Sequence, residues 1–125
     1  MLYNICSFPH INQMKQEPYQ QAARFYGLLS HPARLQILDE LRRDEACVCH
    51  LQALLERPQA YVSQQLRVLR EAGVVADRKD GQLVYYRLDD PHVEHLVEHV
   101  LGPAERSTPP ANCPCPKCAP EVARA

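Results

Sequence analysis

Several features that mark common protein classes are missing from these 125 residues. No run approaches the roughly 18 apolar residues that a membrane-spanning helix needs, and the first fourteen residues lack the cationic start of a secretory signal. The net charge is only −1, which excludes a broadly basic nucleic-acid coat but leaves room for a local basic face. We therefore expect a cytoplasmic protein with no membrane partner.

The motifs of common enzyme sites are also missing. The sequence has no glycine-rich phosphate loop, no nucleophile elbow and no zinc-protease helix. We therefore expect a protein that is not an enzyme and that binds no organic cofactor. The length fits one domain with a modest core, and the 46% hydrophobic and 23% charged residues are near the globular average.

Proline and cysteine, in contrast, are abundant and unevenly placed. Six of the eleven prolines lie in residues 103–125, a density that no helix or central strand tolerates. The sequence thus predicts an N-terminal arm over residues 1–15, a folded domain over 16–102, and a flexible Pro- and Cys-rich tail over 103–125.

Hydrophobic periodicity predicts a mainly α domain with a small β-hairpin. Apolar residues at three- and four-residue steps indicate helices over 17–29, 32–43, 48–55 and 58–71, and a last helix from Asp90-Pro91 to Leu101. Two β-rich runs, 74–79 and 82–88, flank Asp80-Gly81, a strong hairpin signal. The order of four helices, two strands and one helix is typical of a winged helix-turn-helix.

The fourth predicted helix has a polar face suited to DNA. Gln and Ser side chains can meet base edges in the major groove while Arg side chains meet phosphates, and a cationic hairpin adds contacts beside it. The candidate DNA-binding residues are Gln59, Tyr61, Ser63, Gln64, Gln65, Arg67 and Arg70 on the helix, with Arg78 and Lys79 on the hairpin. The alternative is that this face is an ordinary solvated helix surface.

Four stretches, 29–38, 47–51, 62–66 and 84–88, resemble the ArsR/SmtB family of metal-responsive repressors. The resemblance covers about residues 18–101. It implies a homodimer, joined by its first and last helices, that binds double-stranded operator DNA and releases it when an inducing ion binds. Gln65 stands where family members commonly carry His, so the preferred bases are expected to differ.

The first candidate ligands for such an ion are Cys47 and Cys49, at the start of the third predicted helix. Unpaired N–H groups there favour thiolate over thiol, although a cysteine is also a common small buried residue. The resemblance implies that this Cys-Val-Cys run is a ligand pair for thiophilic ions. Without an export signal, the six cysteines are expected to stay reduced.

A third sulfur must come from elsewhere, because Gln52 stands where the family's arsenite pattern has another Cys. Cys6 is the first candidate, since cadmium and lead sensors of the family use arm cysteines. Three thiolates suit arsenite or antimonite, with cadmium, lead or zinc as the alternative inducer. The second source is the tail, which offers Cys113, Cys115 and Cys118.

Histidines offer a weaker second site. Asp90 and His92 match half of the family's zinc motif on the last helix, but Pro103 and Arg106 stand at its later positions. His50, after the cysteine pair, is expected to be a surface residue, since a single His rarely defines a metal site.

Three functions remain open at this point. The leading one is a repressor that releases its operator when an ion occupies the thiols. The second keeps the fold but makes the cysteines a dithiol redox or persulfide sensor, because vicinal thiols of low pKa oxidise readily. The third is a thiol-based metal buffer, which predicts no salt-dependent DNA affinity.

Overall fold

The computed structural model describes residues 9–106 and Cys115, with side chains from Gln16 onward. The chain divides into two compact units, residues 1–31 and 32–125. The first unit contains one helix, α1, and the second contains the remaining elements.

Helix α1 (Pro9–Leu29) begins eight residues before the predicted start at residue 17. Pro18 lies inside it, where it has no N–H to donate and where proline normally breaks a helix. An interior proline therefore hid the earlier start, and α1 overlaps the segment that we expected to be an arm. Tyr19 and Tyr26 on α1 are 73% and 59% exposed. None of the helices that the structure describes is long and apolar enough to cross a membrane.

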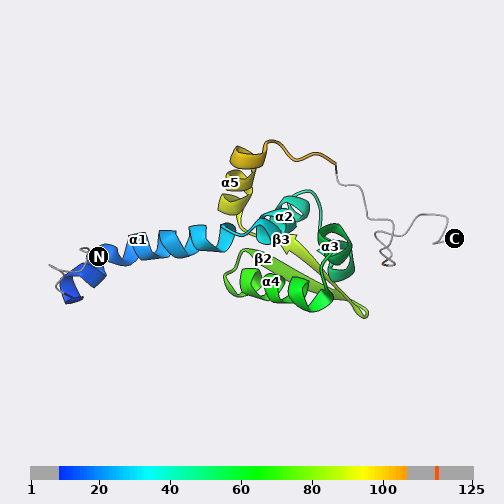
Figure 1. Cartoon of the computed structure of the whole chain (residues 1–125), viewed down its shortest axis with the longest axis horizontal. Helices are drawn as coiled ribbons and strands as arrows, with labels where there is room; N and C mark the ends of the chain where they lie inside the picture. The colour runs from blue at the N-terminus through cyan, green and yellow to red at the C-terminus, as the bar shows by residue number, and fades with distance from the viewer. Residues whose placement is uncertain (1–8, 107–114, 116–125) are drawn as a thin grey trace. The chain divides into compact units, whose positions relative to one another are not determined.

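The second unit has the predicted winged helix-turn-helix order with one added strand (Figure 1). Helices α3 and α4 pack against each other as the helix-turn-helix pair, and β2 and β3 form the wing. Its elements are α2 (Pro32–Leu41), β1 (Ala46–Cys47), α3 (Val48–Leu55), α4 (Gln59–Glu71), β2 (Val75–Asp80), β3 (Leu83–Leu88) and α5 (Pro91–Leu101).

The added strand, β1, makes the sheet three-stranded rather than a two-stranded hairpin. The strand order is β1-β3-β2 with antiparallel pairing, and Cys47 is opposite Tyr85. Two residues are too few to show the alternating pattern by which strands are recognised in a sequence. β1 is therefore a feature that only tertiary contact reveals, and it fixes the first thiol to the sheet.

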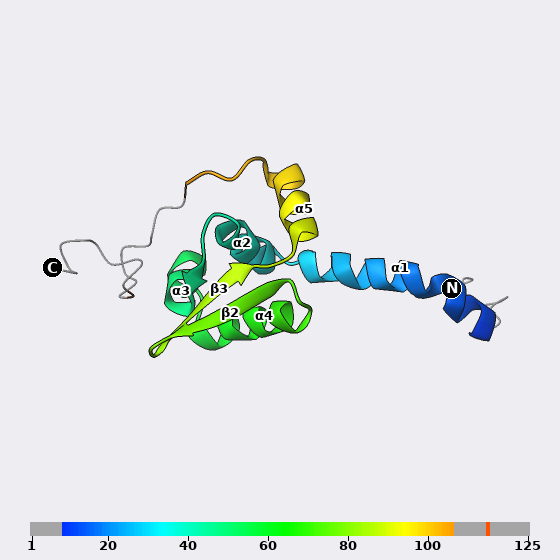
Figure 2. The same cartoon turned by 180° about the vertical axis from the view of Figure 1, so that it is seen from behind.

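The wing turns at Gly81-Gln82, one residue later than predicted. Asp80 still pairs with Leu83, and Gly81 has φ 63°, a left-handed conformation that glycine adopts without strain. A glycine at the first turn position followed by an ordinary residue is typical of a type II′ hairpin. The tip of the wing projects away from the helices in both views (Figures 1 and 2).

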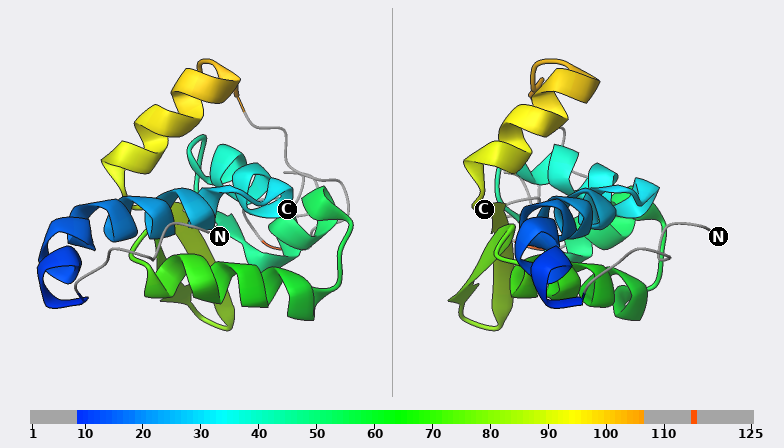
Figure 3. Two further views of the ribbon diagram at one scale, coloured as in Figure 1. Left: turned by 60° about the vertical axis from the view of Figure 1, so that its left-hand side comes forward. Right: turned by 90° about the vertical axis from the view of Figure 1, so that its left-hand side faces the viewer.

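The core of the second unit lies between the helices and the sheet. The predicted inward residues of α4, Val62, Leu66 and Leu69, are fully buried, as are Ile37 of α2 and Leu51 of α3. α4 therefore keeps its apolar stripe inward and leaves its polar face outward. Figure 3 shows the backbone of this helix lengthwise (left). α2 packs against α5 as well as against α3.

Leu66→Ala tests this packing. Truncation of a fully buried leucine should lower the free energy of unfolding by about 2–5 kcal/mol, because both apolar burial and close packing are lost. Urea unfolding followed by circular dichroism measures the change. Gln64→Ala, two residues away on the exposed face, is the matched control and should stay within about 0.5 kcal/mol of the unaltered protein. Equal losses in the two variants would contradict the assigned helix face.

Candidate metal centre and nucleic-acid interface

The first thiol lies at the junction of β1 and α3. Cys47 is the last residue of β1 and the N-cap of α3, with the extended backbone (φ −82°, ψ 167°) that an N-cap requires. Its Sγ accepts a hydrogen bond from the backbone N–H of His50 at 3.4 Å. The predicted position of the Cys-Val-Cys run at a helix start is thus confirmed, and the sulfur itself caps the helix.

Three cysteine sulfurs meet at this junction. The Sγ atoms of Cys47, Cys49 and Cys115 all lie within 4.8 Å of one another, and those of Cys47 and Cys49 are 2.6 Å apart. Metal–sulfur bonds of about 2.3 Å place the sulfurs of one thiolate site about 3.5–4 Å apart, so the Cys47 and Cys49 sulfurs must separate by about 1 Å to bind one ion, and Cys115 is near enough to join them. The donor set is therefore suited to a soft ion held by a single protomer.

Tyr85 forms the wall of this thiol cluster. Cys47, Tyr85 and Cys115 make one buried group, with Cys49 and Leu83 packed against it, and both Cys47 and Cys115 are only 2% exposed. Burial raises the pKa of Tyr85, and the neighbouring sulfurs of Cys115 and Cys47 raise it further. The tyrosine thus remains a neutral hydroxyl beside the sulfurs.

The remaining predicted thiol ligands cannot be placed. Cys6, the first candidate for the third sulfur, and Cys113 and Cys118 of the tail lie outside the described residues. Of the two predicted sources of a third thiol, the structure brings one tail residue, Cys115, to the pair.

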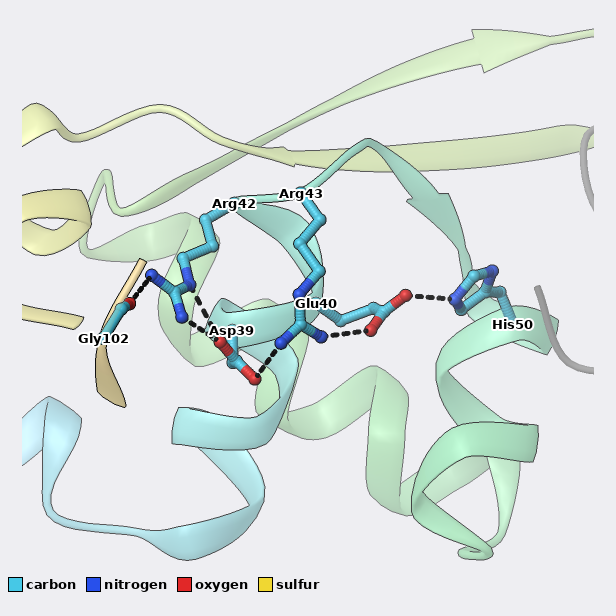
Figure 4. Close-up of polar contacts among 6 residues, drawn as sticks. All are labelled: Asp39, Glu40, Arg42, Arg43, His50 and Gly102. Carbon is cyan, nitrogen blue, oxygen red and sulfur yellow. Dashed lines mark hydrogen bonds and ion pairs between the residues drawn. The ribbon is translucent and has the colours of Figure 1, made fainter. Parts of the chain in front are cut away.

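His50 is not the surface residue that the sequence suggested. It is buried, with 6% of its surface exposed, and its Nε2 lies 2.9 Å from Oε1 of Glu40 on α2 (Figure 4). Placing an imidazole in the first turn of α3 directs it inward against α2, which the sequence does not indicate. The ring therefore connects the thiol-bearing helix with a buried carboxylate.

The second predicted site, on α5, has the geometry of a helix cap. Oδ1 of Asp90 accepts the backbone N–H of His92 at 2.9 Å, and the His92 side chain is exposed. Within residues 16–106 and Cys115, the thiol cluster is the one group of three or more Cys, His, Asp or Glu side chains close enough to share an ion. The half-motif stays a prediction.

All nine predicted DNA-binding residues lie on α4 or β2. Gln59, Gln64 and Arg67 are exposed on α4, and Lys79 is exposed on the wing. Tyr61, Ser63 and Gln65 are half-buried, and Oε1 of Gln65 accepts a hydrogen bond from Nε of Arg34 at 2.8 Å. That bond fixes the amide that replaces the family's common histidine.

Two of the predicted phosphate-binding arginines already have carboxylate partners. Arg70 pairs with Asp77 at 3.1 Å, which joins α4 to the wing. Arg78 forms a two-point pair with Glu45, with Nε–Oε2 at 2.8 Å, and its guanidinium lies 4.6 Å from the ring centre of Tyr85. The pair raises the pKa of Arg78, which therefore remains a cation.

Sequence reasoning missed the residues that contact the candidate site from distant parts of the chain. These residues are Glu40 against His50, Glu45 against Arg78, Arg34 against Gln65, and Tyr85 against Cys47, and they are ten to 38 positions away. Such contacts carry no local spacing signal, and only a tertiary structure reveals them. Tyr85 does belong to one of the stretches that carry the family resemblance.

This architecture, a polar-faced helix beside a cationic wing on a helix-turn-helix core, defines a winged helix-turn-helix DNA-binding regulator rather than an enzyme. Residues 31–77 match the family model described as the bacterial regulatory protein, arsR family. The chain is 36% identical to the transcriptional repressor SmtB homolog of Synechocystis, over 82% of its own length and 86% of that protein. It belongs to the ArsR/SmtB family.

Two further proteins show the range of this similarity. The cadmium resistance transcriptional regulatory protein CadC homolog of Staphylococcus aureus is 41% identical over 67% of this chain and 69% of its own length. The solution structure of a homodimeric winged helix-turn-helix DNA-binding domain from Mycobacterium bovis, a possible ArsR-family regulator, has a TM-score of 0.62 and 31% identity, covering 70% of this chain and 81% of that one.

The unequal burial of the three clustered thiols predicts unequal reactivity. Cys49 is half-buried and lines an open pocket of about 630 Å³ with Gln52, Glu56 and Arg57, whereas Cys47 and Cys115 are closed off. Iodoacetamide should therefore alkylate Cys49 about tenfold or more faster than either neighbour, because a buried thiol reacts only after local opening.

Peptide mass spectrometry after timed quenching measures these three rates. Urea at an unfolding concentration is the control and should make them equal. Faster alkylation of Cys115 than of Cys49 in the folded protein would contradict the buried cluster.

Proposed function

We propose that this protein is a transcriptional repressor that releases operator DNA when a thiophilic ion binds Cys47, Cys49 and Cys115. The observation that carries the proposal is the convergence of these three sulfurs at the N-terminus of α3. The three thiolates would bind the ion, whose positive charge would hold them together. Membership of a family whose relatives include SmtB and CadC repressors supports the same function.

The donor set favours arsenite or antimonite as the inducer. Three thiolates match the trigonal preference of these metalloids, whereas a closed zinc site uses four ligands. Cadmium, lead and zinc are the alternative inducers, and the similarity to a cadmium resistance regulator supports them. Cys6 would then be a fourth ligand.

A second function follows from the contact between two thiols. The 2.6 Å separation of the Cys47 and Cys49 sulfurs places them where a two-electron oxidant such as peroxide can convert them into a disulfide, with both thiol protons and both electrons passing to the oxidant. On this alternative, oxidation rather than an ion weakens DNA binding.

The working form of the repressor is a homodimer. Val100 and Leu101 at the end of α5 are 71% and 50% exposed, and Tyr19 and Tyr26 are exposed on α1. Exposed apolar groups such as these are typical of helix faces that a second copy covers. A two-fold dimer would then present two α4 helices to half-sites about 34–36 Å apart, or a multiple of that distance, on a palindromic operator.

On DNA, α4 would enter the major groove and the wing would lie beside it. Gln59 and Gln64 are exposed where base edges would lie, and Arg67, Arg70, Arg78 and Lys79 supply the phosphate contacts. Tyr61 is held under the guanidinium of Arg57, 4.2 Å from the ring centre. Ser63 and Gln65 complete the polar face.

Fluorescence anisotropy on labelled upstream DNA tests the function and the ligand set together. The reduced protein is titrated with arsenite, cadmium, lead or zinc, and separately with peroxide. We expect ion-dependent release that Cys47→Ser abolishes. Cys115→Ser should weaken ion affinity about 100-fold, because a four-ligand structural zinc site releases about 10–16 kcal/mol, about 3 kcal/mol per ligand.

The matched control is Cys113→Ser, which changes a tail thiol two residues from Cys115. If ion affinity is unchanged in Cys115→Ser but lost in Cys6→Ser, the third ligand is the arm thiol and not the tail thiol. DNA binding that no ion weakens but that peroxide abolishes would favour the redox alternative.

Salt dependence tests the DNA surface. Arg67 is exposed on α4, and Arg67→Ala should weaken binding to specific and unrelated DNA by a similar factor and reduce the log–log salt slope by about 1. Gln64→Ala should instead reduce discrimination between bases. Arg106→Ala, at an exposed position beyond α5, serves as the control for lost positive charge. An unaltered slope in Arg67→Ala would remove this residue from the interface.

A further inference from the structure

A chain of polar contacts joins the thiol cluster to the end of α5, and Figure 4 shows its part from His50 to Gly102. His50 takes part through both its backbone and its side chain. Its backbone N–H donates to the Cys47 sulfur at 3.4 Å, and its ring nitrogen lies 2.9 Å from Glu40 Oε1. One residue therefore joins a predicted ion ligand directly to a buried carboxylate on α2.

From Glu40 the contacts continue along the end of α2. Its Oε2 lies 3.3 Å from Nη1 of Arg43, whose Nη2 lies 3.0 Å from Oδ2 of Asp39. Oδ1 of Asp39 accepts from Nε of Arg42 at 2.8 Å. Two carboxylates and two guanidiniums thus alternate, and their charges cancel along the row.

The row ends on the backbone of the last helix. Nη1 of Arg42 donates to the carbonyl oxygen of Gly102 at 2.7 Å. Gly102 is the C-cap of α5, has φ 86°, and donates its own N–H to Glu98 O at 2.8 Å. Its position in the left-handed region favours glycine. The exposed Val100 and Leu101 immediately precede it.

This row buries charged groups, which is unfavourable if it serves only to stabilise the fold. The side chains of Arg42, Glu40 and His50 are only 2%, 6% and 8% exposed. Buried ion pairs often stabilise a fold less than apolar side chains of the same size. Nε of Arg43 is also buried without a hydrogen-bond partner in the part of the chain that the structure describes. Selection for packing alone would favour apolar residues here.

We infer that the row His50–Glu40–Arg43–Asp39–Arg42 is a relay that couples the thiol cluster to the C-terminal end of α5. This inference rests on the proposed function and names how the site would act. When Cys47 Sγ becomes a ligand, its bond to the His50 N–H must change, and the His50 ring shifts relative to Glu40. Arg42 then transmits the shift to Gly102 and to the apolar end of α5, which we assign to the dimer interface.

The test uses the full chain with Cd²⁺ as the probe and two relay variants, His50→Gln and Arg42→Met. Thiolate absorption gives Cd²⁺ affinity, and anisotropy gives DNA affinity with and without Cd²⁺. In the unaltered protein Cd²⁺ should weaken DNA binding about fivefold or more. In both variants the Cd²⁺ effect should fall below about twofold while metal-free DNA affinity stays within about twofold. Arg42→Lys keeps a donor and should restore part of the effect.

Hydrogen exchange supplies a readout that needs no DNA. Cd²⁺ should change the exchange rate of amides in the last turn of α5 about threefold or more in the unaltered protein and leave it unchanged in the variants. Arg87→Met, which removes an exposed ion pair with Asp89, is the matched control and should respond like the unaltered protein. Thermal melting confirms that each variant is folded.

The two levels of the proposal fail in different ways. If Cd²⁺ binds and α5 responds but DNA affinity does not change, the repressor function is wrong and the relay stands. If unaltered protein and folded variants respond alike in DNA release and α5 exchange, the relay is wrong and the repressor function stands. If the thiols bind neither Cd²⁺ nor arsenite, both are overturned.

Discussion

The second unit depends on one atom, the sulfur of Cys47. The residue ends β1, so its backbone is fixed opposite Tyr85 in the sheet. It also begins α3, where its sulfur occupies the place of the Ser, Thr or Asp oxygen that usually caps a helix. A sulfur that accepts a helix N–H has partial positive charge near it. Folding therefore prepares this atom for a soft ion, and a ligand there must act on the start of α3.

The elements that the sequence revealed are those defined by short-range repetition. The apolar spacing in 58–71, the Asp-Gly pair and the Asp90-Pro91 helix start each act within a few residues, and each led to the right element within one or two positions. α1 departs from this rule because Pro18 imitates a first turn. β1 departs from it because pairing with β3, and not its own sequence, makes two residues a strand.

The candidate site likewise has a part that the sequence predicts and a part that it does not. The Cys-Val-Cys pair and the polar face of α4 are local patterns and were predictable. Burial of His50 and the approach of Cys115 depend on contacts across ten and more than sixty positions. A tail cysteine and an arm cysteine look alike in a sequence, since neither shows which of them reaches the pair. Burial of Cys115 against Tyr85 favours this tail thiol, because a thiol that fills a core position is already at the site when an ion arrives.

The ion pairs of two predicted DNA-binding arginines bear on how the proposed repressor would release DNA. On the proposed DNA surface, Arg70 and Arg78 would exchange Asp77 and Glu45 for phosphates, so each would add less to DNA affinity than an unpaired cation. Exposed ion pairs are weak, and counterion release would still favour the exchange. On this proposal, carboxylates within the protein itself would moderate its DNA affinity. A repressor held by such a surface needs only a modest coupling free energy, about 1–3 kcal/mol, to leave its operator.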